Sequence, residues 1–404
     1  MKYFMLFILV CIFSFNLYAD DNFSYSGYFK NFFSLHTFPH IEKMDDYPPA
    51  GISHNKLRLD ASLSIIKELK LFTGYDLYLI TQDPIFYTEI FEFTQNNISY
   101  RIDDLNEMIY PEKNNLSSFS ISQNLDRFYF KYRFNFADIY FGRQTIARGS
   151  AHVINPTDIF FSYQFNELDT EERKGVDALR IRIPYGMMNE IDLGYVAGKD
   201  LQFDKSGLFL RNKLYLFKTD ISLSATKFKK HFLIGADLTR ALARAGSWLE
   251  AAYIIPEENT DYQDRNFFRV SLGLDYNFTS KLYSYFEYHF NGVGKTEVNE
   301  YNELQNNRAY LDANGYLLGK NYLAGGLNYQ FRPLIPINLL LIANLHDSSI
   351  IAAPTTEYNI AENVYLQAGC YLGLGKSPVD NLFDYQSEFG TYNNIYYTSF
   401  GVYF

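Results

Sequence analysis

The stretch Leu125-Asp126-Arg127-Phe128-Tyr129-Phe130-Lys131-Tyr132-Arg133-Phe134 carries the pattern that decides the fold of this chain. Arginine, tyrosine and lysine occupy one set of alternate positions, and phenylalanine and tyrosine occupy the other. Successive side chains of a β-strand point to opposite faces, so this alternation predicts a strand with one polar face and one apolar face. The same period of two recurs over 56–65, 208–216 and 268–276.

The composition excludes several classes of protein. Aromatic residues make up 18% of the 404 residues, with 36 Tyr and 37 Phe, whereas charged residues make up only 20%. A disordered chain lacks such an aromatic content, and a typical α/β enzyme is poorer in tyrosine. No apolar run of about 20 residues follows the N-terminal segment, which argues against membrane-spanning helices. A large all-β protein remains, either a soluble multi-strand fold or a membrane barrel.

The N-terminus is typical of an exported protein. Lys2 precedes an apolar run over 3–15, and Ala19 is a small residue at the expected cleavage position. This pattern predicts a signal peptide over 1–19 and a mature domain over 20–404. The mature chain keeps one cysteine, Cys370, and therefore has no disulfide framework. The formal net charge of -10 argues against nucleic acid as a partner.

Short and long connections alternate along the chain. Tight turns are expected near 66–69, 135–137, 185–189, 218–219, 241–244, 277–280, 332–336 and 359–362. Longer loops fall between them, including 37–53, 83–123, 147–175, 293–319 and 375–392. This layout is that of an up-and-down antiparallel meander with turns at one end and loops at the other, as in transmembrane β-barrels of the outer membrane. We expect about 18 strands, with 16 as an alternative, over 23–36, 54–65, 70–82, 124–134, 138–146, 176–184, 190–200, 206–217, 220–227, 231–240, 245–255, 264–276, 281–292, 320–331, 337–346, 350–358, 363–374 and 393–404.

The C-terminal segment Tyr396–Phe404 favours the barrel over a soluble sandwich or propeller. Phe400, Val402 and Phe404 alternate up to the last residue, which resembles the signal that bacterial barrel-assembly machinery recognises. Lipid offers no hydrogen bonds, so every strand edge must be paired, and ring closure achieves this. The sequence therefore predicts an outer-membrane barrel surrounded by lipid. Barrels of about 16–18 strands leave an aqueous channel.

Charged residues on the inner face form two groups. By parity, we expect basic side chains from the first half of the chain to point inward: Lys56, Arg58, Arg127, Lys131, Arg133, Arg180, Arg182, Arg211 and Lys213. Inward acids are expected later, at Asp237, Glu250, Asp275 and Glu287. Opposed basic and acidic walls would produce a transverse field, and the denser basic group favours a mild anion preference. The alternative is that these charges only hydrate the inner face.

The loop over 147–175 is too long to be a simple connector. Asn155-Pro156-Thr157-Asp158 is a turn signature. Phe160 and Phe161 are too apolar for a free external loop, so we expect the segment to fold inward as a constriction. An external flap that packs on the rim is the alternative.

Two segments beside this loop carry a resemblance to a known family. They are Tyr140-Phe141-Gly142-Arg143-Gln144 and Gly175-Val176-Asp177-Ala178-Leu179-Arg180. Together with the Asn-Pro-Thr-Asp turn, they resemble the Gly-Arg-Gln region of alginate-export-type outer-membrane barrels. The resemblance implies a barrel of 18 strands and a pore for an anionic polymer, lined by basic residues. It carries this role to Arg143 and, more weakly, to Arg180.

The sequence contains no motif of an enzyme. None of the 7 histidines forms a metal pair such as HExxH, and His289 with Glu287 is the best candidate pair on one strand face. We expect no metal and no cofactor. The leading hypothesis is a passive outer-membrane channel for small hydrophilic, anionic solutes. The alternatives are a dedicated exporter of an anionic polysaccharide that works with periplasmic partners, and a non-conducting barrel with adhesive or structural external loops. The pattern makes no prediction of the oligomeric state.

Overall fold

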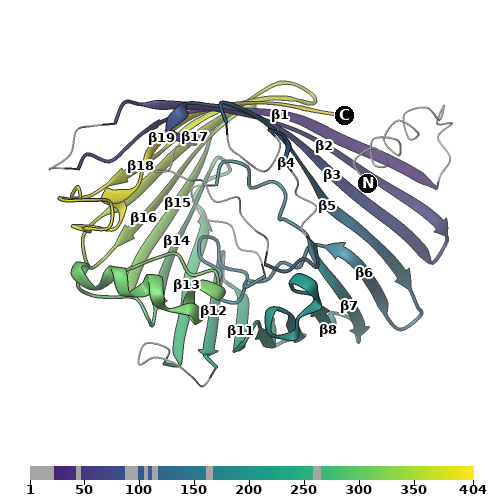
Figure 1. Ribbon diagram of the computed structural model, residues 1–404. Coiled ribbons are helices and arrows are strands. Elements are labelled where there is room, and N and C mark those ends of the chain that lie inside the picture. Colours follow the sequence, from purple (N-terminus) through teal and green to yellow (C-terminus); the bar gives the residue numbers. More distant parts are fainter. Residues whose placement is uncertain are drawn as a thin grey trace.

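The computed structural model describes residues 22–41, 47–86, 99–103, 108–111, 117–160, 167–257 and 265–404. The signal peptide expected over 1–19 and Phe161 of the long loop lie outside these residues. Within them, the chain forms a closed antiparallel barrel of 18 strands with one extra strand and almost no helix (Figure 1). No described helix is long and apolar enough to cross a membrane.

The strands follow one another around the barrel in chain order, apart from one short addition. Their bounds are β1 (Phe23–Thr37), β2 (Ala50–Ile66), β3 (Leu69–Gln82), β4 (Met108–Tyr110), β5 (Phe119–Arg133), β6 (Asp138–Gln144), β7 (Val176–Tyr185), β8 (Asn189–Val196), β9 (Gly207–Leu216), β10 (Thr219–Phe228), β11 (His231–Leu242), β12 (Ala245–Ile255), β13 (Phe267–Asn277), β14 (Leu282–Asn291), β15 (Asn321–Arg332), β16 (Ile335–Asn344), β17 (Ile350–Ala361), β18 (Val364–Leu374) and β19 (Asn394–Tyr403). The short β4 pairs with β5, while β3 also pairs directly with β5. The count of 18 barrel strands expected from the sequence is therefore confirmed.

The barrel closes between its first and last strands. β1 and β19 pair in one register from Tyr28 opposite Tyr403 to Thr37 opposite Asn394. The backbone of Phe404 exchanges two hydrogen bonds of 2.9 Å with Gly27. Because of this seam, the 18 barrel strands in the described part of the chain form a closed ring without an open edge, which is the arrangement that a lipid environment requires.

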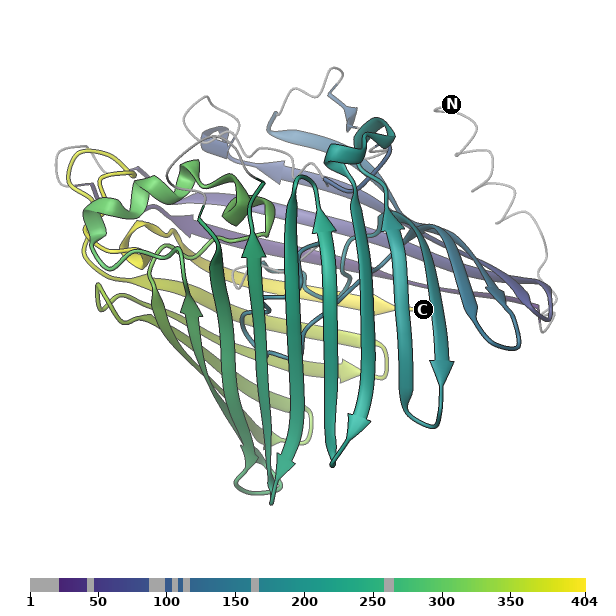
Figure 2. The same ribbon diagram turned by 90° about the horizontal axis from the view of Figure 1, so that it is seen from below.

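The two ends of the barrel differ as the spacing of the sequence predicts. Tight turns lie along one edge in Figure 2, and the long connections, including η6 (Val298–Asn306) and α2 (Arg308–Asp312), lie along the opposite edge. The turn between β9 and β10 shows how the strands reverse. Phe217 and Lys218 both have positive φ, of 51° and 61°, as the central residues of a type I′ hairpin turn require.

The alternation of side chains separates an apolar outer face from a polar inner face. Phe141 is 63% exposed, and Phe268, Leu210 and Leu272 are also well exposed on the outer side of their strands. Apolar side chains gather inside the barrel as well, where the long connections fold inward. Phe209, Leu233 and Ile254 of the strands pack there with Phe160 and Tyr310 of the connections. A second cluster gathers Ile154 and Leu317 of the connections with Tyr322 and Ile342, so the interior is partly filled.

Candidate functional site

The connection over 147–175, here called the inner loop, lies inside the barrel in its described parts, 147–160 and 167–175 (Figure 1). Phe160 is only 3% exposed, and its ring lies 5.2 Å from that of Tyr100 and 5.8 Å from that of Phe209. Ile159, next to it, is fully buried. Phe160 and Ile159 thus pack against the inner face of the barrel wall.

Glu250 on β12 anchors the turn of the inner loop. Its carboxylate accepts hydrogen bonds from the backbone N–H of Thr157 at 2.8 Å and from the Thr157 hydroxyl at 2.7 Å. It also accepts the backbone N–H groups of Ser150 and Ala151, both at 3.2 Å. The nearby Asp237 on β11 accepts the hydroxyl of Ser150. Both acids expected on the inner face therefore bind the loop rather than standing free in the lumen.

Glu287 on β14 makes a second anchor. The carboxylate accepts the backbone N–H groups of His152 and Ile154, each at 2.9 Å, and the N–H of Val153 at 3.3 Å. The indole N–H of Trp248 donates to the same group at 3.0 Å. Hydrogen bonds from backbone N–H groups to a carboxylate are charge-assisted and stronger than neutral ones.

The second half of the inner loop reaches the opposite wall of the barrel. Asp169 accepts a hydrogen bond of 2.9 Å from Lys56 on β2 and one of 3.4 Å from Lys30 on β1. Glu171 pairs with Lys30 and accepts the Tyr403 hydroxyl at 2.7 Å. The inner loop therefore bridges the lumen, from β12 and β14 on one side to β1, β2 and β19 on the other.

Asn155 and Asp158 of the predicted turn both make contacts within the inner loop. The backbone carbonyl of Asn155 accepts the N–H of Asp158 at 3.3 Å, which closes the turn. Asp158 is 1% exposed and pairs with Arg173. Burial raises the pKa of the Asp158 carboxyl to about 7, although Arg173 opposes this shift.

Arg148 and Asp169 of the inner loop also have pKa values that their surroundings shift. The Arg148 guanidinium lies 4.3 Å above the Phe209 ring and 5.2 Å above the Phe160 ring, and burial lowers its pKa to about 10. Burial alone would raise the pKa of Asp169, but Lys56 and Lys30 outweigh it and hold that pKa below its usual value. Arg148 near the start of the inner loop thus packs against aromatic rings, and Asp169 in its second half is held by two lysines of the barrel wall.

Most of the predicted basic row is paired with acids. Arg58 contacts Asp60 at 2.7 Å, Asp126 at 3.0 Å and Asp76 at 3.1 Å. Arg127 pairs with Asp126 and, at 3.2 Å, with Glu172 of the inner loop. Asp76 and Asp126 are not among the inward acids expected from the sequence, but both are buried beside these arginines on the inner wall.

A β-bulge explains why the sequence pattern missed one of these acids. Gly74 pairs with Arg127 and Tyr75 pairs with Leu125, so Asp126 has no opposite partner. The extra residue lets Asp126 and Arg127, which are adjacent in sequence, both reach the interior. Strict alternation places Asp126 on the apolar outer face.

The remaining basic residues fall on β5 to β9. Arg180 and Arg211 share Asp192, at 2.8 Å and 3.2 Å. Arg182 pairs with Glu190. Lys131 and Arg133 both contact Asp138, at 2.9 Å and 3.5 Å. Among the described residues, Lys213 has no carboxylate within ion-pair distance, and Asp275 accepts the backbone N–H of Gly246 at 3.1 Å.

Arg143 binds the rim of the barrel. Its guanidinium contacts Asp177 at 2.8 Å, and its other donors reach the backbone carbonyls of Leu125 at 2.9 Å and Asp103 at 2.8 Å. The register pairs Arg143 with Phe128, whose ring is exposed on the outer face. Arg143 therefore ties the segment 99–103 to the barrel, and its partners are not those of a free pore-lining arginine.

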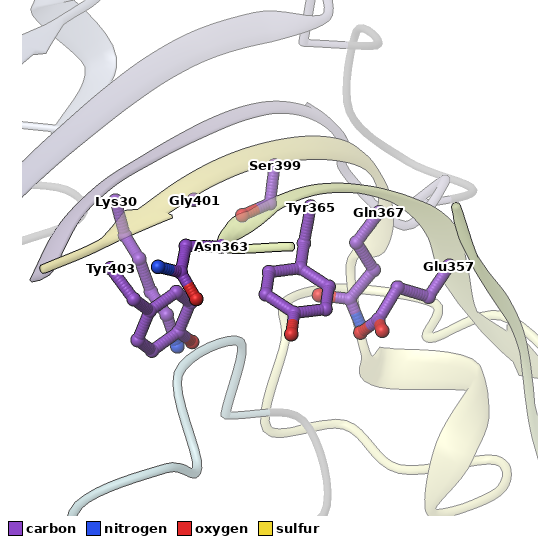
Figure 3. Close-up of a pocket in the computed structure, with 8 residues that line it drawn as sticks. All are labelled: Lys30, Glu357, Asn363, Tyr365, Gln367, Ser399, Gly401 and Tyr403. Carbon is purple, nitrogen blue, oxygen red and sulfur yellow. The ribbon is translucent and has the colours of Figure 1, made fainter. Parts of the chain in front are cut away.

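Open space lies along the inner face of β14 to β19, here called the tyrosine wall, beside the points where the inner loop contacts this face through Ile154, Glu287 and Tyr403. A recess of about 360 Å³ is lined by Lys30, Glu357, Asn363, Tyr365, Gln367, Ser399, Gly401 and Tyr403 (Figure 3). A second recess of about 460 Å³ lies beside Tyr283, Tyr285, Asn328, Asn338, Thr355 and Tyr371. Sequence reasoning did not single out this wall, although Tyr365, Gln367, Gly369 and Tyr371 alternate with apolar residues in β18.

His289, the candidate histidine of the sequence, is buried and hydrogen-bonded within the barrel wall. His289 is 2% exposed, and its Nδ1 lies 2.9 Å from the hydroxyl of Ser271, which itself donates to the backbone carbonyl of Ile154 at 2.6 Å. Glu287 faces the inner loop instead of His289. No group of three or more potential metal ligands occurs in the described part of the chain.

Comparisons with known proteins identify the fold but no family. No family model matches the chain, and no curated protein matches it. Among solved structures, it is similar to OccK8 (OprE) of Pseudomonas aeruginosa, with a TM-score of 0.58, 7% identity, and coverage of 95% of this chain and 98% of that one. It is also similar to OccD3 (OpdP) of Pseudomonas aeruginosa, with a TM-score of 0.56, 9% identity, and coverage of 95% and 91%. OccAB4 of Acinetobacter baumannii gives a TM-score of 0.56, 8% identity, and coverage of 95% and 97%.

At such low identities the likeness concerns the fold alone. The resemblance to alginate-export-type barrels is not confirmed by these matches and stays a prediction. What the comparisons establish is that this chain folds as a barrel of 18 strands whose structural neighbours are outer-membrane porins.

Proposed function

We propose that this protein is a bacterial outer-membrane channel through which small hydrophilic solutes diffuse passively. The observation that carries the proposal is a closed barrel with a polar inner face and an inner loop fixed to both walls, which leaves recesses along the tyrosine wall. Such a loop narrows the lumen without covalent chemistry. The porin fold of its structural neighbours supports this interpretation.

The outer surface is suited to lipid. Exposed apolar side chains such as Phe141, Phe268 and Leu272 occur on strands around the barrel, outside the polar lumen. We place the protein in the outer membrane, reached through the predicted signal peptide. Phe400 and Phe404 are exposed on the outer side of β19, where the assembly machinery would meet them together with Val402.

Basic residues remain in excess at the turn end of the barrel. Lys131 and Arg133 share a single aspartate, and Lys213 has no ion pair among the described residues. The side chain of Arg133 is 69% exposed. Charges that line a pore entrance attract ions of opposite sign. We therefore infer a mild anion preference. It arises from Lys131, Arg133 and Lys213 at the turn end of the barrel and not from all the inward basic residues.

Swelling of proteoliposomes tests the proposal. Full-length protein in vesicles loaded with an impermeant polymer should let arabinose and small carboxylates enter, which causes measurable swelling. Vesicles without protein are the control. If the vesicles do not swell in any of the small solutes, the channel function is refuted. The alternative hypothesis, a non-conducting barrel with adhesive or structural loops, would then be favoured.

Export of an anionic polysaccharide is a weaker candidate. A basic track for a polyanion would need accessible cations, but Arg58, Arg127 and Arg180 are paired and buried or half-buried. We therefore favour diffusion of small solutes.

A further inference from the structure

The tyrosine wall carries neighbouring aromatic rings on the lumen side. The Tyr365 and Tyr403 rings lie 5.5 Å apart in an edge-on arrangement, with an interplanar angle of 86°. Tyr371 and Tyr397 stack at 6.0 Å and 19°. Figure 3 shows Tyr365 and Tyr403 pointing into the recess from adjacent strands. These two groups of rings mark two positions along one wall.

Glycine keeps part of this wall open. A Cβ atom on Gly369 would lie 2.9 Å from the backbone carbonyl of Pro354 and 3.0 Å from the Tyr397 ring. A side chain at this position would displace the stacked rings. On β18, Gly369 lies between Gln367 of the first recess and Tyr371 of the second.

Amide and hydroxyl groups lie beside the rings. Asn363, Gln367 and Ser399 line the first recess, and Asn328, Asn338 and Thr355 line the second. An amide side chain both donates and accepts hydrogen bonds. The recesses therefore offer flat aromatic surfaces next to uncharged polar groups.

Net charge near the wall is low. Lys30 and Glu357 are the charged residues among those that line the two recesses. Lys30 pairs with Asp169 and Glu171 of the inner loop, so its charge is already compensated. This chemistry does not favour a strongly anionic solute at these positions.

The spacing along β18 matches an extended ligand. Tyr365 and Tyr371 are on one strand, which places them about 20 Å apart at the usual rise of a β-strand. Sugar rings present an apolar C–H face that packs on aromatic rings and hydroxyls that bond to amides. A chain of linked sugar rings could contact both recesses together.

From this combination we propose that the tyrosine wall is a binding track for uncharged linear oligosaccharides within the channel. The inference rests on the proposed channel function and names its substrate class. The rings of Tyr365 and Tyr371 hold two separated sugar units of one chain, and Gln367 and Asn338 bond to hydroxyls of that chain. A weak track of this kind lets the chain slide through the lumen past the inner loop.

The test uses the full-length protein in planar bilayers, with maltohexaose and xylohexaose as probes. Either sugar should lower the ion current in a saturable way. Tyr365→Ala and Tyr371→Ala should each raise the half-blocking concentration by about tenfold, the size of one lost aromatic contact. Tyr396→Ala is the matched control, since Tyr396 lies on the outer side of neighbouring β19. The sugars should lower the current through this variant at the same concentrations as for the wild type.

The outcomes separate this inference from the channel itself. If the wild type conducts ions but neither sugar lowers the current, the track is refuted while the channel stands. Equal block of wild type, Tyr365→Ala and Tyr371→Ala also refutes it. Block by spermidine that Glu357→Gln abolishes, without any effect of sugar, would make this a cation site instead. If the wild type shows no ion current, the proposed function fails.

Discussion

Arg58 illustrates how single residues hold the inner wall together. It is 1% exposed, and its guanidinium contacts Asp60, Asp76 and Asp126 from three strand segments. A buried charge without its partner is costly, whereas the pair itself contributes little net stability. The role of Arg58 is therefore to neutralise the buried aspartates.

Replacing Arg58 with methionine tests this role. Arg58→Met removes the cation that Asp76 and Asp126 share, while Lys56 and Arg127 remain beside them. We expect a loss of about 3–5 kcal/mol in the free energy of unfolding. Urea unfolding in detergent micelles measures it. Lys213→Met, at a position without an ion pair in the described structure, should change stability by no more than about 0.5 kcal/mol. Equal effects of the two substitutions would contradict the account.

Glu388 gives a prediction of pH dependence at the same scale. It lies in the connection before η7 (Phe389–Thr391), is fully buried, and binds Tyr322, the amide of Asn344 at 2.8 Å and the N–H of Leu318 at 2.9 Å. Burial raises its pKa from 4.5 to about 7, and the neighbouring Asp347 adds to the shift.

A carboxyl whose pKa is raised on folding binds its proton more tightly in the folded state. The stability that it contributes is full below pH 4.5 and falls as the pH rises towards about 7. Thermal unfolding from pH 4 to pH 8 should therefore show a decline in the wild type that is smaller in Glu388→Gln. Parallel curves for the two proteins would show that Glu388 titrates normally.

The inner loop is the element on which the channel depends. Glu287 gathers three successive backbone N–H groups of this loop, and Glu250 gathers three others. Two carboxylates, one on β12 and one on β14, thus replace the hydrogen bonds that secondary structure would give. The position of the inner loop, and with it the proposed constriction, follows from these anchors.

Substitution of the anchor should loosen the constriction. In Glu287→Gln, one carboxylate oxygen becomes an NH₂ donor that faces backbone donors, so we expect the loop to detach part of the time. Single-channel currents should become noisier, and trypsin should cut within 147–175 faster. Glu357→Gln, on the inner face but away from the loop anchors, is the control. Unchanged noise and cleavage in Glu287→Gln would show that the anchor is dispensable.

At the element scale, the sequence predicted strands better than it predicted contacts. Alternation in Leu125–Phe134 and the spacing of turns located the strands, because strand faces and hairpin turns are local properties. The bulge at Asp126 was missed, since a bulge depends on pairing with Gly74. The anchoring role of Glu250 and Glu287 was missed for the same reason: the partner is a loop distant in sequence.

Across the whole molecule, the inner loop divides the lumen into two sides. One side holds paired charges and a first apolar cluster. The other side is the tyrosine wall, with a second apolar cluster around Ile154 and Tyr322 and with the two recesses. Net positive charge remains at the turn end. Solutes would therefore meet basic residues at one mouth and aromatic and amide groups along the path.

The ion preference of the whole channel should follow the charges at the turn end. Lys131→Gln, Arg133→Gln and Lys213→Gln, combined in one variant, should move the reversal potential in a KCl gradient towards zero. Lys218→Gln, in the turn after β9, is the control for a change in surface charge. An unmoved reversal potential in the triple variant would place the selectivity elsewhere.

Recording of single channels from the purified wild type in planar bilayers tests the central claim most directly. The account predicts discrete ion-conducting steps. In a KCl gradient, the reversal potential should be displaced from zero towards the equilibrium potential of chloride. A barrel that inserts into the bilayer and gives no conducting steps would contradict it.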